Sequence, residues 1–227
     1  MSNKHIQLNK DLVAAGKSGE SALSSLVSTR WKDFNAVNPA TAYTHLLLLR
    51  LSTSRDAGAK RNAGQTRQSE REKALDLLEP VLCEQHVQAF EARQCASMLH
   101  AMAKTRDRQA CADLMRALEA RAREVPHEFD PREIANTMWA FATLRRQPHD
   151  ELVAGLSARA RQVRHNFNPQ NIANTLWALA TLGLQPNNTL MEGLTARALE
   201  VRHDFKPQEI ANTLWAFATL GLQPDIA

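Results

Sequence analysis

The sequence predicts an all-α protein whose fold is an α-solenoid, a stack of antiparallel helix pairs. A fifteen-residue motif over residues 130–144 returns over 168–182 and again over 206–220, so the period is thirty-eight residues. A fixed period of this length is typical of repeat proteins, in which each unit buries its apolar face against its neighbours. One tryptophan stands at the same place in every copy of the motif: Trp139, Trp177 and Trp215.

Composition excludes several classes of protein. The chain has 227 residues, of which 44% are hydrophobic and 5% aromatic, and this favours one repeat array over two globular domains. Its longest apolar run, around residues 45–51, is far shorter than the ~20 residues that a membrane-spanning helix needs. The sequence contains no glycine-rich phosphate loop, no recurrent pair of carboxylates and no nucleophile beside a base. We therefore expect no membrane segment, no enzymatic activity and no cofactor.

The N-terminal segment, residues 1–33, starts polar and then has the pattern of an amphipathic helix. It lacks the apolar core and small-residue cleavage site of a secretory signal. Organelle transit peptides are rich in arginine and poor in acids, whereas this segment holds Asp11 and Glu20 and has no arginine before Arg30. A transit peptide is therefore not evident.

Residues 34–89 form a divergent first repeat that contains an insertion. Its opening, residues 34–43, aligns loosely with the later motif and predicts a helix through Leu51. From about 52 to 69 the chain has no apolar residue larger than alanine, so it cannot bury enough surface to fold alone. We expect a mobile basic loop there, serving either as a solvated insertion or as an arm that contacts phosphates.

Basic charge is concentrated around this insertion. Residues 50–73 hold seven Lys or Arg against three Asp or Glu, whereas residues 129–227 hold nine of each. Nucleic-acid binding depends on Lys and Arg that displace counterions from phosphates. The neutral surface of the repeats therefore argues against tight, non-specific binding to nucleic acid by the repeats.

The regular array follows as units over 90–128, 129–166 and 167–204, and as a truncated unit over 205–227. Each complete unit continues into a second helix with a single apolar stripe, which in the last complete unit is Leu190, Met191, Leu194, Ala198 and Val201. The truncated unit has no second helix. Its apolar face is expected to be uncovered, which indicates a fragment or a need for a capping partner.

The ends of the motif helices are marked by specific residues. Pro131 and its equivalents fall in the first turn, where a missing N–H costs little. Gly183 and Gly221 can adopt the left-handed conformation that ends a helix. The unit over 129–166 has Arg145 at this place, so we expect its helix end to be less well formed.

Cysteine and histidine do not predict a metal site. The three cysteines lack Cys-x-x-Cys spacing, and we expect buried thiols in a reducing compartment. Three histidines recur once per repeat, which indicates a structural position that the units share. These residues are Cys83, Cys95 and Cys111, and His127, His165 and His203.

One face of the motif helix is polar enough to meet solvent. At 100° per residue, Ile134, Met138 and Phe141 fall on the core side, whereas Asn136 and Ala140 fall on the opposite side with the charged residues. Constant amides with variable polar neighbours suit a surface that reads one base per repeat by hydrogen bonds to base edges. An asparagine ladder that bonds adjacent repeats is an equal alternative. The candidate RNA-binding residues are Arg93, Gln94, Ser97, Lys104, Arg132, Glu133, Asn136, Thr143, Gln170, Asn171, Asn174, Thr181, Gln208, Glu209, Asn212 and Thr219.

Two further features leave alternatives open. The tryptophan lies at the border between core and polar face, where it could stack on a base or fill the gap between repeats; the small neighbours Ala135 and Ala142 favour packing. Arg121, Arg159 and Arg197 recur on the second helix, where they could form a positive stripe or an ordinary solvated face.

The motif from Pro169 to Gly183, repeated from Pro207 to Gly221, resembles the octotricopeptide repeats. The resemblance covers about residues 30–227 and is strongest from 129 onward. It implies an α-solenoid that binds organelle transcripts and controls their stability, splicing or translation, and it places the RNA on the polar face of the first helices. It also implies a chloroplast or mitochondrial location, with the cytoplasm as the alternative. Nothing in the chain matches the nuclease-like domain that ends many members.

Two functions from different classes follow. The first is sequence-selective binding of single-stranded RNA by the repeat array, in post-transcriptional regulation. The second is a protein-interaction scaffold, with the uncapped C-terminal edge as a docking surface. Similar short helical repeats occur in secreted effector proteins, where the array binds host proteins. The RNA target, the compartment and the oligomeric state do not follow from the sequence.

Overall fold

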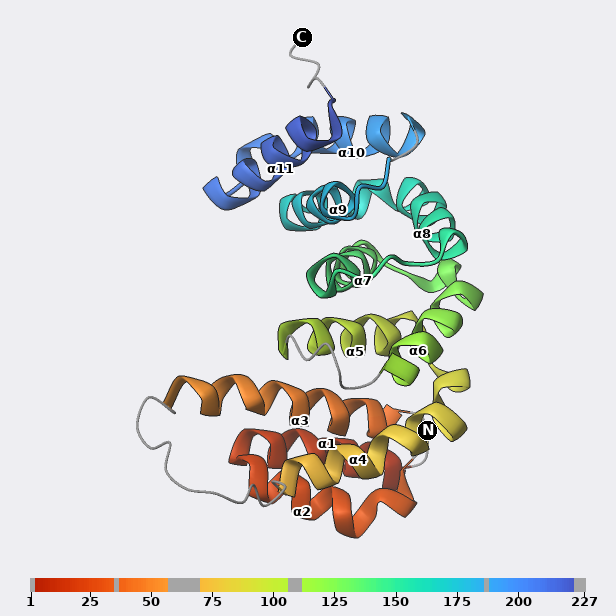
Figure 1. Cartoon of the computed structure of the whole chain (residues 1–227), viewed down its shortest axis with the longest axis vertical. Coiled ribbons are helices and arrows are strands. Elements are labelled where there is room, and N and C mark those ends of the chain that lie inside the picture. The colour runs from red at the N-terminus through yellow and green to blue at the C-terminus, as the bar shows by residue number, and fades with distance from the viewer. Residues whose placement is uncertain (1–2, 35–36, 57–69, 106–111, 186–187, 223–227) are drawn as a thin grey trace. The chain divides into compact units, whose positions relative to one another are not determined.

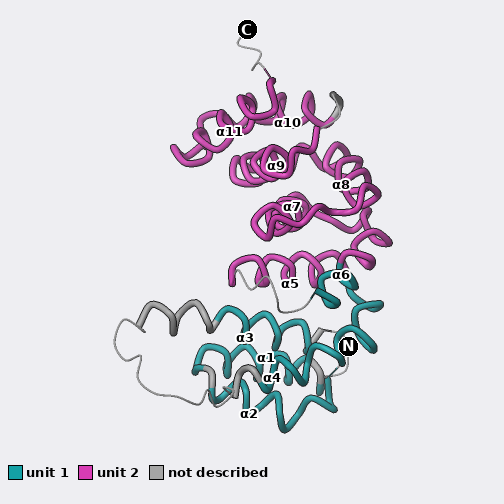
Figure 2. The backbone as a smooth tube through the Cα atoms, in the orientation of Figure 1, with its two compact units in different colours: residues 1–90, 107–118 teal, residues 91–106, 119–227 magenta. Residues whose placement is uncertain are grey.

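The computed structural model describes residues 3–34, 37–56, 70–105, 112–185 and 188–222. Within these residues the chain forms eleven α-helices joined by short 3-10 and π turns and no β-strand, which confirms the all-α helical-repeat fold. The chain divides into two compact units, one of residues 1–90 with 107–118 and the other of residues 91–106 with 119–227 (Figure 2). Among the residues that the structure describes, no helix is both long enough and apolar enough to cross a membrane.

The first unit contains four complete helices and the start of α6 (Ala112–Glu124), up to Leu118. The four complete helices are α1 (Asn3–Ser18), α2 (Glu20–Arg30), α3 (Val37–Asp56) and α4 (Glu70–Val81). They are followed by a π turn (Leu82–His86) and a 3-10 turn (Val87–Ala89). Helix α1 packs against α2 and α3, and α2 also packs against α4 (Figure 1).

The N-terminal segment forms two helices rather than the single amphipathic helix that the sequence predicts. Gly19, with φ of 119°, separates α1 from α2. Leu8 and Leu12 of α1 and Leu23 and Val27 of α2 are at most 1% exposed, because spacings of four residues place each pair on one helix face. The first 33 residues therefore belong to a packed helical core.

Helix α3 is longer than predicted. It continues to Asp56, so the first five residues of the predicted basic loop, from Ser52, are helical. The sequence from Ser52 lacks large apolar residues, but serine, threonine and arginine can continue a helix that has already been nucleated. The remaining predicted loop, residues 57–69, lies outside the described residues.

The second unit consists of helix pairs. The first helices of the pairs are α5 (Ala92–Thr105), α7 (Pro131–Leu144), α9 (Pro169–Leu182) and α11 (Pro207–Leu220). The second helices are α8 (Asp150–Gln162), α10 (Asn188–Glu200) and the part of α6 (Ala112–Glu124) from Glu119. Figure 1 shows α5, α7, α9 and α11 stacked in chain order, and each packs along the next.

The first helices begin as the sequence predicts. Pro131, Pro169 and Pro207 each occupy the first turn. In α7 the Asp130 carboxylate accepts a hydrogen bond from the Glu133 backbone N–H at 2.8 Å, and the Glu133 carboxylate accepts one from the Asp130 N–H at 2.9 Å. This reciprocal pair satisfies two backbone donors that a helix leaves open at its start.

The end of α7 is as well formed as the others, so the prediction for Arg145 is wrong. Arg145 adopts the left-handed conformation at φ 53°, close to Gly183 at 66° and Gly221 at 68°. The Arg145 N–H donates to the Ala142 carbonyl and the Arg146 N–H donates to the Phe141 carbonyl, both at 3.1 Å. These bonds satisfy carbonyls at the helix end and hold the arginine in a conformation that it otherwise disfavours.

The repeated arginines of the second helices are structural. The Arg159 Nε donates to the Phe129 carbonyl at 2.9 Å, and the Arg197 Nε donates to the Phe167 carbonyl at 3.0 Å. Both phenylalanines are fully buried at the start of a first helix. Each guanidinium thus ties a second helix to the loop that precedes the first helix of its own pair, and these two side chains do not form a solvated or positive stripe.

Candidate functional site

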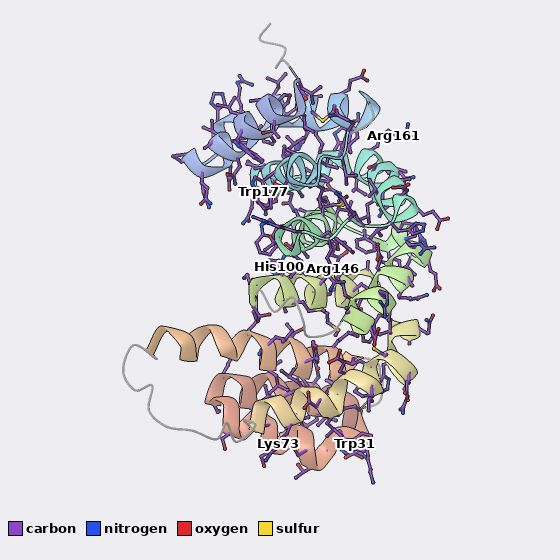
Figure 3. The ribbon with its side chains drawn as sticks, viewed as in Figure 1. Trp31, Lys73, His100, Arg146, Arg161 and Trp177 are labelled. Carbon is purple, nitrogen blue, oxygen red and sulfur yellow. The ribbon has the colours of Figure 1, made fainter. Side chains whose placement is uncertain are left out.

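Sixteen side chains of the second unit form a regular grid, which we call the first-helix surface. Each first helix contributes residues at spacings of four, seven and eleven from its first member, which fall on one narrow stripe of a helix. All sixteen are exposed or half-buried. They are Arg93, Ser97, His100 and Lys104 of α5; Arg132, Asn136, Trp139 and Thr143 of α7; Gln170, Asn174, Trp177 and Thr181 of α9; and Gln208, Asn212, Trp215 and Thr219 of α11. Figure 3 shows His100 and Trp177 on this side of the unit, with Arg161 on the side of the second helices.

The exposed stripe is narrower than the sequence predicts because each inner first helix is flanked by two others. Ala140, predicted to face solvent, is 0% exposed, as are Ala178 and Ala216 at the same place in the next repeats. A methyl side chain at this position lets adjacent first helices approach closely along their flanks. The assignment of Ala140 to the solvent face is therefore wrong.

Several other predicted RNA-binding residues lie outside the grid and accept hydrogen bonds from backbone N–H groups at the starts of the first helices. The side chain of Gln94 accepts a hydrogen bond from the Glu91 N–H at 3.1 Å, as Glu133 does from Asp130. Glu209 accepts one from the Lys206 N–H at 2.9 Å. The equivalent Asn171 is buried, with 7% of its surface exposed. Burial raises the pKa of Glu133, and the hydrogen bond from the Asp130 N–H opposes this shift.

The amides of the grid are available to a ligand. Among the described residues, the side chains of Asn136, Asn174 and Asn212 form no hydrogen bond to one another or to other protein groups. The alternative of an asparagine ladder between repeats is therefore wrong. Each half-buried amide offers two donors and one acceptor to whatever meets this surface.

Aromatic rings form the neighbouring row of the grid. The ring centroids of His100 and Trp139 lie 5.1 Å apart at an angle of 53°, so the repeats that contain α5 and α7 are in contact through this row. This contact supports the packing role of the tryptophan. Trp215 is nevertheless 47% exposed, and Trp139 and Trp177 are half-buried. All three tryptophans are therefore partly accessible in the row beside the asparagines.

Charge on the grid is uneven. Its three permanent cations, Arg93, Lys104 and Arg132, lie on α5 and α7, whereas α9 and α11 carry only neutral side chains there. Burial, followed by the charges of Lys104 and Arg132, lowers the pKa of His100 to about 4. His100 is therefore neutral at pH 7 and can both donate and accept a hydrogen bond.

The three threonines of the grid, Thr143, Thr181 and Thr219, differ in exposure. The Thr143 hydroxyl oxygen is buried and has no hydrogen-bond partner among the described residues. Thr181 and Thr219 are exposed. The predicted polar role is thus open to these two residues and closed to the Thr143 hydroxyl.

The cysteines and repeated histidines lie apart from this surface. Cys95 is buried and its pKa is raised to about 12 by burial, while Cys83 is half-buried rather than buried; Cys111 is outside the described residues. His127, His165 and His203 occupy the 3-10 turns Pro126–Glu128, Arg164–Asn166 and Arg202–Asp204, where all three are exposed. No three His, Cys, Asp or Glu side chains in the described ranges are grouped to hold a metal ion.

The fold and this surface define a helical-repeat protein whose first helices carry a polar and aromatic surface. A family model described as RNA-editing substrate-binding complex 6 protein matches residues 65–225. The chain belongs to this family, which supports an RNA-associated helical protein but not specifically an octotricopeptide repeat protein. A search of curated proteins found no match.

Proposed function

We propose that the chain binds single-stranded RNA through the first-helix surface. The observation that carries the proposal is the row of three amides, Asn136, Asn174 and Asn212, which recurs every thirty-eight residues without a hydrogen-bond partner among the described residues. The edges of unpaired bases present the donors and acceptors that such amides recognise. The description of the family, which names RNA editing and substrate binding, supports this choice of ligand.

The other rows supply complementary contacts. Trp215, which is 47% exposed, and the half-buried Trp177 are the candidates for stacking on bases, an interaction worth ~1–3 kcal/mol per base. Arg93, Lys104 and Arg132 can contact phosphates at the α5 and α7 end of the grid. The proposed mode is one base for each repeat, which the thirty-eight-residue recurrence of the amides would allow.

The test is fluorescence-anisotropy binding of the full chain to a pool of short single-stranded RNAs at two salt concentrations. Replacement of Asn136, Asn174 and Asn212 by alanine removes three hydrogen-bonding groups of ~0.5–1.5 kcal/mol each, so the affinity should fall at least about tenfold. The matched control replaces two exposed amides outside the grid, Asn166→Ala with Gln185→Ala, and should bind as the parent does. No RNA binding by the folded parent, or equal loss in the control, would overturn the proposal.

The proposed biological role is non-enzymatic, post-transcriptional regulation of organelle transcripts. The family description supports a place in an RNA-editing complex, and the octotricopeptide resemblance supports a mitochondrion or chloroplast. A fluorescent fusion of the chain viewed with organelle markers tests the location. A purely cytoplasmic signal would contradict it.

A second candidate function is that of a protein-interaction scaffold. It is favoured by the apolar face of α11, on which Leu214 is 56% exposed and Ile210 is 45% exposed. Association with protein partners is also in keeping with the word complex in the family description. Tight protein binding that is insensitive to salt, without RNA binding, would favour this function.

A further inference from the structure

Two neighbouring repeats present identical side chains on the first-helix surface. The repeats of α9 and α11 both carry a glutamine, an asparagine, a tryptophan and a threonine at the four grid positions. The repeat of α7 has the same asparagine, tryptophan and threonine, but it holds Arg132 where the other two hold Gln170 and Gln208. On the grid, one side chain therefore distinguishes α7 from the two helices that follow it.

The three helices present these side chains in the same way. Each has fourteen residues, begins with a proline in the first turn and ends at a residue in the left-handed conformation. They are stacked in chain order, and each packs along the next (Figure 1). Because the backbone fixes the direction of each Cα–Cβ bond, equivalent grid positions meet a ligand in equivalent orientations. A difference in side chain is thus a difference in recognition.

The position that varies is free to meet a ligand. Arg132, Gln170 and Gln208 are exposed, and among the described residues their side chains form no hydrogen bond or ion pair. The other polar position at which the three helices differ serves the helix starts or the interior: Glu209 accepts a hydrogen bond from a backbone N–H, and Asn171 is buried. Discrimination between repeats therefore depends on the first row of the grid.

Glutamine and arginine suit different base edges. An amide offers a donor beside an acceptor, which matches N6 and N7 of adenine, whereas a guanidinium offers only donors, which match O6 and N7 of guanine. Single-stranded RNA exposes these edges. A base contact uses two of the five N–H donors of arginine, so Arg132 can still contact a phosphate.

We infer that the chain selects RNA in which the two neighbouring bases read by α9 and α11 are the same, and in which Arg132 imposes a different choice on the adjacent base, read by α7. The inference rests on the proposed function and names the class of RNA that the surface takes. Adenine is the base expected at the two equal positions and guanine at the position of Arg132. Arg132 is the specificity-determining residue of this part of the array.

Exchange of the variable residue between repeats tests the inference. The full chain and its variants would each select from a pool of random single-stranded RNAs, and the bound RNAs would be sequenced. The parent should enrich two equal bases beside a different one. Arg132→Gln gives all three helices the same grid residues and should enrich three equal bases. Gln170→Arg should move the equal pair to the positions of α7 and α9, with a change in base preference of about fivefold or more at the altered position.

Two variants outside the grid match the changes in charge. Arg161→Gln removes one positive charge and Gln185→Arg adds one, and both positions are exposed. Both should enrich the same RNAs as the parent does. Arg132→Gln introduces the residue that the next two repeats already hold, and circular dichroism verifies that every variant folds.

The outcomes separate this inference from the proposed function. Bound RNAs without two equal neighbouring bases, or exchanges that leave the enriched bases unchanged, would overturn the inference and leave RNA binding intact. Equal changes in the Arg161→Gln and Gln185→Arg variants would also overturn it, because they would show an effect of net charge. If the folded parent enriched no RNA, the proposed function would fail and the inference with it.

Discussion

Arg145 adopts a backbone conformation that is strained for an arginine, whereas the equivalent positions of the next two repeats hold glycine. It is the single residue other than glycine with positive φ in the described ranges, at the place where the next two repeats have Gly183 and Gly221. The left-handed conformation is disfavoured for residues that carry a Cβ atom. The hydrogen bonds of the helix end hold it in place, so the strain should be relieved by glycine.

We therefore predict that Arg145→Gly raises the free energy of unfolding by ~0.5–1 kcal/mol. Urea denaturation followed by circular dichroism measures this change. The reverse substitution, Gly183→Arg, is the matched control and should lower the free energy of unfolding. An Arg145→Gly chain that is less stable than the parent would show that the arginine side chain makes a stabilising contact that outweighs the strain.

His100 should make stability depend on pH. Its pKa is lowered to about 4, first by burial and then by Lys104 and Arg132, whereas an unfolded histidine titrates near 6.5. Between these values the unfolded chain binds a proton that the folded chain does not, so stability should fall as the pH drops from about 6.5 toward 4. Above pH 6.5 this residue contributes no pH dependence.

Replacement of His100 by glutamine tests this prediction. Thermal unfolding at intervals from pH 7 to pH 5 should show a smaller loss of stability for His100→Gln than for the parent. Carboxylates titrate mainly below this range, and their contribution is common to both chains. Identical curves for the two chains would contradict the assigned role of His100.

The first helices differ in whether a side chain caps their N-terminal backbone N–H groups. Asp130 and Asn168 each accept a hydrogen bond from the third residue of the helix that follows, at 2.8 and 2.9 Å. Lys206 stands at the same place before α11 and makes no such bond, since an ammonium group has no acceptor. It also places a positive charge at the positive end of a helix dipole.

We predict that Lys206→Asp stabilises the chain by ~1 kcal/mol and that Asp130→Ala destabilises it by a similar amount. Urea denaturation midpoints provide the comparison. Lys206→Ala is the control, because it removes the charge without adding an acceptor, and should have a smaller effect. If aspartate and alanine at this position gave equal stability, the capping account of α11 would be wrong.

The period of the motif predicts where the helix pairs lie. It is a poorer guide to which side chains of one helix are buried. The positions of Pro131 and Gly183 are local signals that decide helix ends regardless of the surroundings. The burial of Ala140 depends on neighbouring first helices on both flanks, and a helical wheel of one helix contains no information about them. The helix pair at residues 3–30 has no repeated motif, so only contacts with α3 and α4 reveal that it is packed.

The candidate site was predictable in part for the same reason. Twelve of the sixteen grid residues follow from the polar face of the motif. The other four, His100 and the three tryptophans, lie at the border of that face, where exposure depends on packing between repeats. Gln94, Glu133 and Glu209 have polar side chains that serve the helix starts, a role that spacing from Glu91, Asp130 and Lys206 could have indicated. Burial of Asn171 has no signal in the sequence.

For the whole molecule, the small number of cations on the grid sets the salt dependence of RNA binding. Three phosphate contacts, from Arg93, Lys104 and Arg132, correspond to a slope of about −2 for the logarithm of the affinity against the logarithm of salt concentration. Replacing these residues by the neutral ones of the other repeats, as Arg93→Gln, Lys104→Thr and Arg132→Gln, should bring the slope close to zero. A parent slope steeper than about −4 would require phosphate contacts from other basic residues of the chain.

The central claim is that RNA lies on the first-helix surface, and photo-crosslinking tests it most directly. The full chain would be crosslinked to single-stranded RNA that contains 4-thiouridine, and the modified residues would be located by mass spectrometry. The account predicts crosslinks on α7 and α9, at Trp139, Trp177 or the residues beside them. Crosslinks confined to Arg161 and Arg202, or to the basic segment over residues 50–73, would contradict it.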